Sequence, residues 1–270
     1  MKVKRRNFLE HISGWTMGGL LGLVGSTIQV QAFSEIRRKS DNKAASDLEK
    51  LKMILKGKDP NIWLFTGDSI THGAKHTHGH RSYPEVFQER IRWEISRVRD
   101  VVINTGISGH AASNILSDFE WRVAQFKPGV VSVMIGTNDC AREGMTPELY
   151  RQHLSELIQR IREIDAIPIL HTPNIIILDA SPERRTLPKY IPVLRDLAAQ
   201  ENVVLVDNYG HWETTGSERT MEYVFRTWLN DPLHPNQFGH QEIARLMFQV
   251  LDIFDPNAAT CGGPYFEGKH

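Results

Sequence analysis

The chain has 270 residues, of which 40% are hydrophobic, and its 32 Lys and Arg balance its 32 Asp and Glu. This length is sufficient for one α/β domain with a substantial core and short terminal extensions. No basic stripe interleaved with aromatic residues occurs in the sequence, so we expect no nucleic-acid partner. The two cysteines exclude a disulfide-dense scaffold, and neither belongs to a Cys-x-x-Cys pair.

Residues 1–33 resemble a twin-arginine export signal. The arginines at positions 5 and 6 precede Phe8 and Leu9, and a weakly apolar, glycine-rich segment follows at 12–30. An uncleaved membrane anchor is the alternative, because this segment is nearly long enough to span a bilayer. Its glycines and polar residues make it a poor anchor. We therefore expect a cleaved signal and a periplasmic or extracellular mature chain without a stable membrane span.

Three further parts follow the signal. Residues 34–59 form a charged lead, in which Leu51 and Ile54 belong to an apolar series at helical spacing that predicts a short amphipathic helix. Residues 60–256 form the main domain, and residues 257–270 form a C-terminal tail.

The main domain alternates between two kinds of segment. Apolar runs predict five strands, at 61–65, 101–103, 130–135, 167–170 and 203–206. Segments with helical periodicity lie between or after them, at 81–99, 115–126, 147–164, 190–201 and 237–254. Continuous apolar strands alternating with amphipathic helices indicate a parallel sheet covered on both faces. We predict an α/β fold, a three-layer α/β/α sandwich with a five-stranded parallel sheet.

Polar residues gather where the predicted strands end. The first strand runs into Gly67 and Ser69, at the edge of the sheet where α/β enzymes place their chemistry. A serine there is also a common helix cap, so Ser69 alone decides nothing. The second strand is followed by Gly109 and the third by Asn138, which serve either as ordinary turn residues or as hydrogen-bond donors to a ligand.

Asp231 lies three residues before His234, and a proline follows each of them. A carboxylate at this spacing can face one imidazole nitrogen and leave the other nitrogen free to face a nucleophile.

These blocks resemble those of the SGNH, or GDSL-type, hydrolases, in the family's order and over roughly residues 61–254. They are Gly67-Asp68-Ser69, Gly109, Gly136-Thr137-Asn138-Asp139 and Asp231-Pro232-Leu233-His234. The resemblance implies a flavodoxin-like hydrolase domain in which Ser69 is the nucleophile, His234 the general base and Asp231 its orienting acid. It also implies an oxyanion hole made by the backbone N–H of Ser69, the N–H of Gly109 and the side-chain amide of Asn138. Such a mechanism requires no cofactor and no metal.

Four histidines in nine residues, at positions 72, 76, 78 and 80, offer a zinc or nickel site as an alternative. No carboxylate or cysteine lies among them, so we interpret them as a polar loop at the mouth of the cleft. His110 is interpreted in the same way, as a residue lining the cleft.

The resemblance implies an ester, thioester or amide-like acyl substrate. The segment 210–219 is polar and offers no apolar lid for a long acyl chain, and export points to carbohydrate as the carrier. We therefore expect a serine esterase that removes acetyl groups from a small-molecule or polysaccharide ester. A lysophospholipase or thioesterase is the alternative within the enzymes, and a catalytically idle carbohydrate-binding protein is the alternative outside them. Trp212, Trp228 and Tyr223, in what reads as a long irregular segment, either cover the core or stack on a sugar ring.

Cys140 and Cys261 leave two possibilities open. In an oxidising compartment they could form a disulfide that draws Tyr265 and Phe266 of the tail to the catalytic rim. Equally, Cys140 could be a packed apolar residue and Cys261 a free thiol in a frayed tail. The sequence leaves the acyl chain, the sugar position and the oligomeric state undecided.

Overall fold

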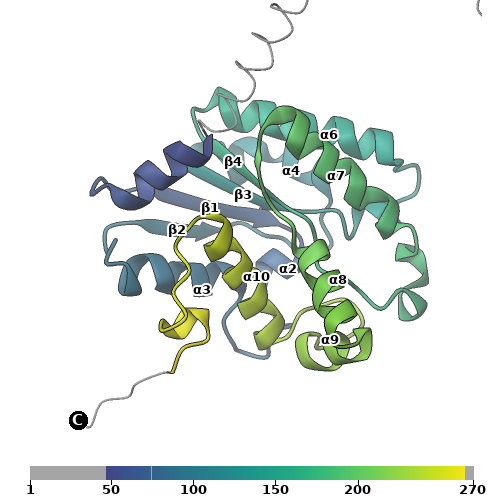
Figure 1. Ribbon diagram of the computed structural model, residues 1–270. Helices are drawn as coiled ribbons and strands as arrows, with labels where there is room; N and C mark the ends of the chain where they lie inside the picture. Colours follow the sequence, from purple (N-terminus) through teal and green to yellow (C-terminus); the bar gives the residue numbers. More distant parts are fainter. Residues whose placement is uncertain (1–46, 74, 265–270) are drawn as a thin grey trace, which may run out of the picture. The chain divides into compact units, whose positions relative to one another are not determined.

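A computed structural model describes residues 47–73 and 75–264 (Figure 1). The proposed export signal and the aromatic residues Tyr265 and Phe266 lie outside the described residues. Within the described ranges, no helix is both long enough and apolar enough to cross a membrane.

The sheet has five parallel strands in the order β2-β1-β3-β4-β5, which confirms the predicted fold class. The strands are β1 Ile62–Gly67, β2 Val101–Asn104, β3 Val130–Met134, β4 Ile167–His171 and β5 Val204–Val206. Strands β1, β3 and β4 carry the most buried runs, because they lie inside the sheet and helices cover both of its faces.

Helices lie on both sides of this sheet (Figure 1). On one side α4 packs on α6 and α6 packs on α7, and on the other side α10 packs on α3. The helices are α2 Ser69–His72, α3 Tyr83–Glu89, α4 Ala112–Ser117, α5 Phe119–Arg122, α6 Pro147–Glu163, α7 Leu187–Glu201, α8 Asn208–Glu218, α9 Met221–Trp228 and α10 Gln237–Val250. Residues 47–56 are also helical, and Leu51 is fully buried, as the apolar spacing predicts.

The predicted helix at 81–99 is shorter in the structure. It begins at Tyr83, where the carboxylate of Glu85 accepts hydrogen bonds from the backbone N–H and the hydroxyl of Ser82. After Glu89 it widens into a π-helical turn, Arg90–Glu94. Arg90 there donates to the carbonyl of Ile253 in the chain that follows α10, so side-chain contacts with the C-terminal segment accompany the change in helix type.

Two other expectations were wrong in their details. The helix expected at 115–126 is divided into α4, α5 and a 3₁₀ turn, Ala124–Phe126, with a break at Asp118. The segment before Asp231, expected to be irregular, forms α8 and α9. The side chains of Asp207 and Thr220 accept backbone hydrogen bonds from Gly210 and Tyr223 at the first turns of these helices, and such caps stabilise the start of a helix.

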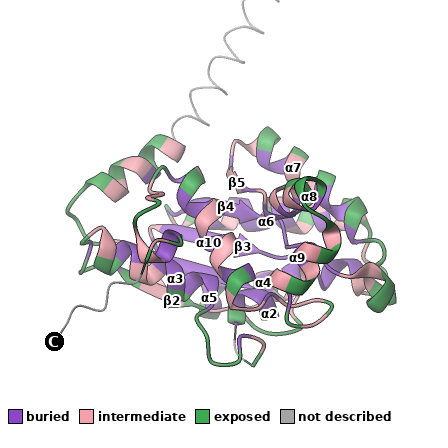
Figure 2. Cartoon of the chain, turned by 60° about the horizontal axis from the view of Figure 1, so that its bottom comes forward, coloured by how far each residue is buried: buried purple, intermediate pink, exposed green. Residues whose placement is uncertain are grey.

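The core occupies both faces of the sheet (Figure 2). Trp63 of β1 is buried edge-on against Phe87 of α3, with ring centroids 5.1 Å apart. Its indole N–H donates to Asp100 over 2.8 Å, and Arg97 pairs with the same carboxylate. The start of β1 is therefore anchored to the loop before β2.

Both cysteines are free and buried. Cys140 lies after β3, where its thiol donates to the carbonyl of Thr137, whereas Cys261 lies in a 3₁₀ turn that packs on α10. Thr260 beside it is bonded to Glu94 through both its backbone N–H and its hydroxyl. The disulfide is therefore wrong, because both thiols are free. The frayed tail is wrong for residues 257–264, because this segment packs on α10 and contributes to the core.

Candidate active site

The site forms at the carboxyl ends of β1 and β3, neighbouring strands at which the chain order along the sheet changes direction. Chains on the two sides of such a switch point diverge and leave a crevice. Gly67 ends β1, and a Cβ added there would lie only 2.2 Å from the Met134 carbonyl oxygen of β3. Glycine is thus required for the two strand ends to approach each other. The side chain of Asp68 then accepts the N–H of Ile70 and caps α2, which begins at Ser69.

Ser69, His234 and Asp231 are joined by hydrogen bonds, although Ser69 and His234 are 165 positions apart. The hydroxyl oxygen of Ser69 lies 2.9 Å from Nε2 of His234. Nδ1 of His234 lies 3.0 Å and 2.9 Å from the two carboxylate oxygens of Asp231. The structure therefore brings together the three side chains that the sequence analysis selected.

The Asp231–His234 turn is held by more than its two prolines. Oδ1 of Asp231 accepts the N–H groups of Leu233 and His234, each over 2.8 Å. The amide of Asn174, after β4, donates to the Leu233 carbonyl, and the amide of Asn236 donates to the Leu229 carbonyl. These two asparagines carry no sequence signal, because their partners come from other segments or from local turn geometry.

The charge of Asp231 is favoured. Partial burial raises its pKa, but the N–H groups of His234 and Leu233 and the His234 imidazole outweigh burial and lower the pKa below 3.8. The carboxylate therefore remains ionised at neutral pH, as a partner for an imidazolium must be.

Gly109 and Asn138 lie on the segments that follow β2 and β3. Gly109 has φ +81°, a left-handed conformation that favours glycine. The Asn138 amide donates from Nδ2 to the His110 carbonyl over 3.1 Å and accepts at Oδ1 from Arg184 over 3.0 Å. Both ends of the amide are thus held. Arg184 lies in a short 3₁₀ turn before α7, and the sequence analysis missed it.

Two carboxyl groups lie beneath these segments. Burial raises the pKa of Asp68 to about 7 and that of Asp139 to about 6. Oδ1 of Asp139 accepts the N–H of Ala112 at the start of α4, which ties the Asn138 segment to the Gly109 segment. Both carboxyl groups are used in backbone hydrogen bonds.

Arg122, from α5, is a further residue that the sequence analysis missed. Its Nη2 donates to the hydroxyl of Thr66 and to the carbonyls of Gly67 and Thr105, over 3.0, 3.1 and 2.8 Å, and its Nη1 lies 3.1 Å from Nδ1 of His110. One buried guanidinium therefore fastens the ends of β1 and β2 together. No apolar period or motif points to an arginine in that place.

Of the four histidines in the 72–80 loop, only His76 reaches the Ser69–His234–Asp231 group. Its ring stacks on the His234 ring, with centroids 3.4 Å apart and planes 8° apart. Nδ1 of His72 instead lies 3.1 Å from the Ser108 hydroxyl, and His78 and His80 are exposed. His110 contacts Arg122 as described above.

The three aromatic residues before Asp231 differ in their burial. Trp212 and Trp228 are buried and pack against each other edge-on at 5.0 Å. These two tryptophans therefore cover the core. The alternative that they stack on a sugar ring is wrong. Tyr223 is partly exposed, with the Arg219 guanidinium over its ring.

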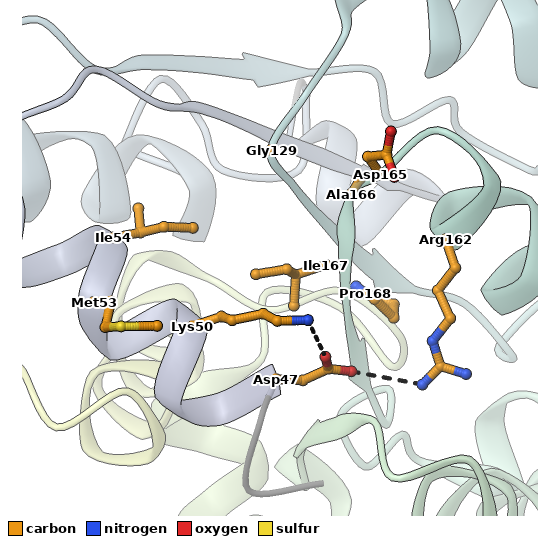
Figure 3. A pocket seen from close by; sticks show the side chains of 10 residues that line it. All are labelled: Asp47, Lys50, Met53, Ile54, Gly129, Arg162, Asp165, Ala166, Ile167 and Pro168. Carbon is orange, nitrogen blue, oxygen red and sulfur yellow. Dashed lines mark ion pairs between the residues drawn. The ribbon is translucent and has the colours of Figure 1, made fainter. Parts of the chain in front are cut away.

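A pocket of about 580 Å³ lies away from this chemistry (Figure 3). It is lined by residues 47–54, by Gly129 before β3 and by Ile167 and Pro168 at the start of β4. In Figure 3 Asp47 points between Lys50 and Arg162 and pairs with both. The pocket is at the amino ends of the strands, whereas Ser69 and Asn138 follow the carboxyl ends, so it does not belong to the candidate site.

Comparison with known proteins decides the family. Residues 65–242 match the model of the GDSL-like lipase/acylhydrolase family. The chain belongs to this family. The match begins within β1 and ends within α10, so it contains Ser69, Asn138 and His234. The protein is therefore a carboxylic ester hydrolase of the SGNH type.

Three known proteins are similar to this chain. An acetylxylan esterase of Geobacillus stearothermophilus is 28% identical over 206 residues, which are 70% of this chain and 92% of that enzyme. The structure of a mutant acetyl-xylooligosaccharide esterase from Geobacillus has a TM-score of 0.59 at 25% identity, covering 72% of this chain and 96% of that one. An uncharacterised protein of Mycoplasma pneumoniae is 36% identical over 121 residues, 43% of this chain, and the chain spans 14% of its length.

Proposed function

We propose that this protein is a serine esterase that removes short acyl groups, acetyl above all, from carbohydrate. The single observation that carries the proposal is the hydrogen-bonded series from Ser69 through His234 to Asp231. A serine hydroxyl is too weakly acidic to attack an ester unaided, and a histidine in contact with it supplies the missing base.

In the first half of the reaction, Ser69 Oγ forms a bond to the ester carbonyl carbon while Nε2 of His234 takes the hydroxyl proton. Asp231 holds the imidazole in the tautomer with a proton on Nδ1 and stabilises the imidazolium that results. The tetrahedral intermediate then expels the alcohol, which leaves with the proton from His234, and the acyl group stays on Ser69.

In the second half, water attacks the acyl-serine with His234 again as base, and the acid leaves as Ser69 recovers its proton. The oxyanion of each tetrahedral intermediate needs donors arranged in advance. We assign this role to the N–H groups of Ser69 and Gly109 and to the second N–H of the Asn138 amide, whose first donates to His110.

The proposed substrate class rests on two observations. The acetylxylan esterase resembles this chain along 92% of its own length, so the whole catalytic domain corresponds and not a fragment of it. In addition, the segment 210–219 that precedes Asp231 is polar and offers no apolar lid for a long acyl chain. Both favour a short acyl group on a polar carrier.

We further propose that the protein acts outside the cytoplasm. The support is the twin-arginine pattern at positions 5–9 and the apolar segment after it. Fractionation of cells that express the whole chain, with and without replacement of Arg5 and Arg6 by lysine, tests this directly. Retention of both forms in the cytoplasm would contradict the proposal.

The catalytic proposal is tested with purified protein on nitrophenyl esters of increasing chain length and on acetylated xylo-oligosaccharides. Turnover should be greatest on acetyl esters, acetate should be released from the glycan, and Ser69→Ala should abolish both while the melting temperature stays unchanged. A rate maximum at long acyl chains would favour a lysophospholipase or thioesterase. Substantial turnover by Ser69→Ala would exclude Ser69 as the nucleophile.

A further inference from the structure

The loop between α2 and α3 presents one histidine to the catalytic base. His76 stacks on His234 almost face to face, and its Nδ1 lies 3.6 Å from Oδ2 of Asp231. The His76 side chain is 19% exposed and that of His234 is 12% exposed, so each ring shields the other from water. The stack is therefore a partly buried contact at the candidate site.

The loop holds this histidine in place by backbone geometry. Gly73 has φ +71°, and a Cβ added there would lie 2.4 Å from the Cβ of Ser82, so the two ends of the loop touch. The N–H of Thr77 donates to the Gly73 carbonyl over 3.3 Å, and Thr77 is buried. His76 thus precedes an anchored residue and does not lie at a free loop tip.

A metal ion is the first role that these residues suggest, because ligand atoms of His76, Asp231 and His234 lie within 4.8 Å of one another. The ring planes argue against it. Imidazole binds a metal through a lone pair in the plane of the ring, and a tetrahedral ion needs two such lone pairs to converge. Rings that are parallel within 8° direct their lone pairs side by side. Moreover, Nδ1 of His234 already faces Asp231 at 2.9 Å.

A second role fits the geometry. The contact of Nδ1 of His234 with Asp231 fixes one edge of the ring but leaves the ring free to tilt about that edge. A tilt moves Nε2 away from the Ser69 hydroxyl, at 2.9 Å, on which proton transfer depends. An aromatic ring lying flat against one face blocks the tilt towards that face and stabilises the upright ring by contact.

We propose that His76 is a positioning residue for catalysis, whose ring stacks on His234 and holds Nε2 of that histidine against Ser69. This inference rests on the proposed roles of Ser69, His234 and Asp231. It extends them to a residue that acts on the reaction through its stack on His234, beside its contact with Asp231.

The charges around His76 agree with this role. The titratable groups that act on it are His234 and Asp231 in the stack and Lys75 beside it in the loop. Burial, and then the charge of His234, lower the pKa of His76 below 6.5, whereas Asp231 opposes them. His76 is therefore neutral at neutral pH.

Three variants test the proposal. His76→Ala removes the ring, His76→Phe keeps a flat ring without ionisable nitrogens, and His80→Ala changes an exposed histidine of the same loop as the matched control. We expect His76→Ala to lower kcat on nitrophenyl acetate by roughly 10- to 100-fold with little change in KM, as misplacement of a catalytic group does. His76→Phe should restore most of kcat, and His80→Ala should resemble the wild type.

A second measurement distinguishes an effect on the catalytic base His234 from an effect on substrate binding. Diethyl nitrophenyl phosphate transfers its diethylphosphoryl group to the oxygen of an activated serine and releases nitrophenolate. Intact-mass measurement follows the increase in mass as Ser69 is modified. The rate of this gain should fall in His76→Ala in parallel with kcat and recover in His76→Phe. Melting temperatures of all variants are measured alongside, so that a loss of fold is recognised.

The possible outcomes distinguish failure of the positioning role from failure of the proposed esterase function. If the wild type hydrolyses no ester, the proposed function itself fails. If the wild type is active and Ser69→Ala is not, wild-type rates in His76→Ala would overturn the positioning role alone. Rates in His76→Phe as low as in a folded His76→Ala would also overturn it, because the flat ring would then not be what His234 requires.

Discussion

Nη2 of Arg184 donates a hydrogen bond to Oδ1 of Asn138 over 3.0 Å, from a 3₁₀ turn 46 residues further along the chain. A guanidinium can only donate, so this contact requires the amide oxygen to face Arg184 and the amide nitrogen to face the opposite way. That nitrogen donates to the His110 carbonyl and retains a second N–H for the cleft. Arg184 thereby fixes the orientation of the Asn138 amide, to whose nitrogen we assign the oxyanion-binding role.

We predict that Arg184→Met lowers kcat on acetyl esters because the amide loses the partner that holds its orientation. Asn138→Ala should lower turnover by about 10²- to 10³-fold, as loss of one oxyanion donor does. In the double variant Arg184→Met should have little further effect, since there is no amide left to orient. Arg185→Met, at the exposed neighbouring position, is the control. Fully additive losses would show that Arg184 acts independently of Asn138.

Asp231→Asn should leave the protein folded, because an amide oxygen can still accept the N–H groups of Leu233 and His234. Its NH₂ group, however, faces Nδ1 of His234 and favours the wrong tautomer, so turnover should fall by several orders of magnitude, about 10⁴ in an unrelated triad. Steady-state kinetics with a thermal melt measure both effects. Asp252→Asn, where the carboxylate is largely exposed, should leave turnover unchanged. Wild-type turnover in Asp231→Asn would mean that another group orients the imidazole.

His171 predicts a pH dependence of stability. Burial lowers its pKa to about 3, below its ordinary value of 6.5. Between these values the unfolded chain binds a proton that the folded protein excludes, so the free energy of unfolding falls as the pH falls from 6.5 towards 3. The loss from this one group is roughly 1.4 kcal/mol per pH unit at most.

Replacing His171 should remove its contribution to the loss of unfolding free energy at low pH. Between pH 6.5 and pH 4 we expect His171→Gln to lose less unfolding free energy than the wild type, whatever its stability at neutral pH. Urea unfolding at both pH values measures the difference, with the exposed His78→Gln as control. Equal losses in His171→Gln and wild type would show that His171 is protonated as readily in the folded state as in the unfolded one.

The two thiols should behave as free and protected groups. Burial raises the pKa of Cys140 to about 12, and a thiol reacts as its thiolate. Iodoacetamide should therefore modify the native protein slowly, and after unfolding without reductant it should add to both Cys140 and Cys261. Peptide mapping of the alkylated protein checks this. Recovery of the two cysteines in one cross-linked peptide would contradict the structure.

The sequence by itself determined the layers of the fold and the catalytic candidates. The apolar run at 130–135 predicted a strand correctly, because a strand buried on both faces is apolar throughout. The amphipathic segment at 147–164 predicted a helix correctly, because a helix buried on one face repeats its apolar residues at helical spacing. Ser69, Asn138 and His234 could be found for a related reason, since each stands in a short motif whose residue types suit ester hydrolysis.

Only the tertiary structure decided which distant side chains support them. Arg122, Arg184 and Asn174 hold the site through partners 17 to 59 residues away. His76 differs from the three histidines around it in that its ring stacks on His234. It also decided that the C-terminal segment packs Cys261 on α10 while Cys140 lies after β3. A hydrogen bond or a stack between remote segments depends on how the sheet and its crossovers bring those segments together, and no local pattern in the chain records that.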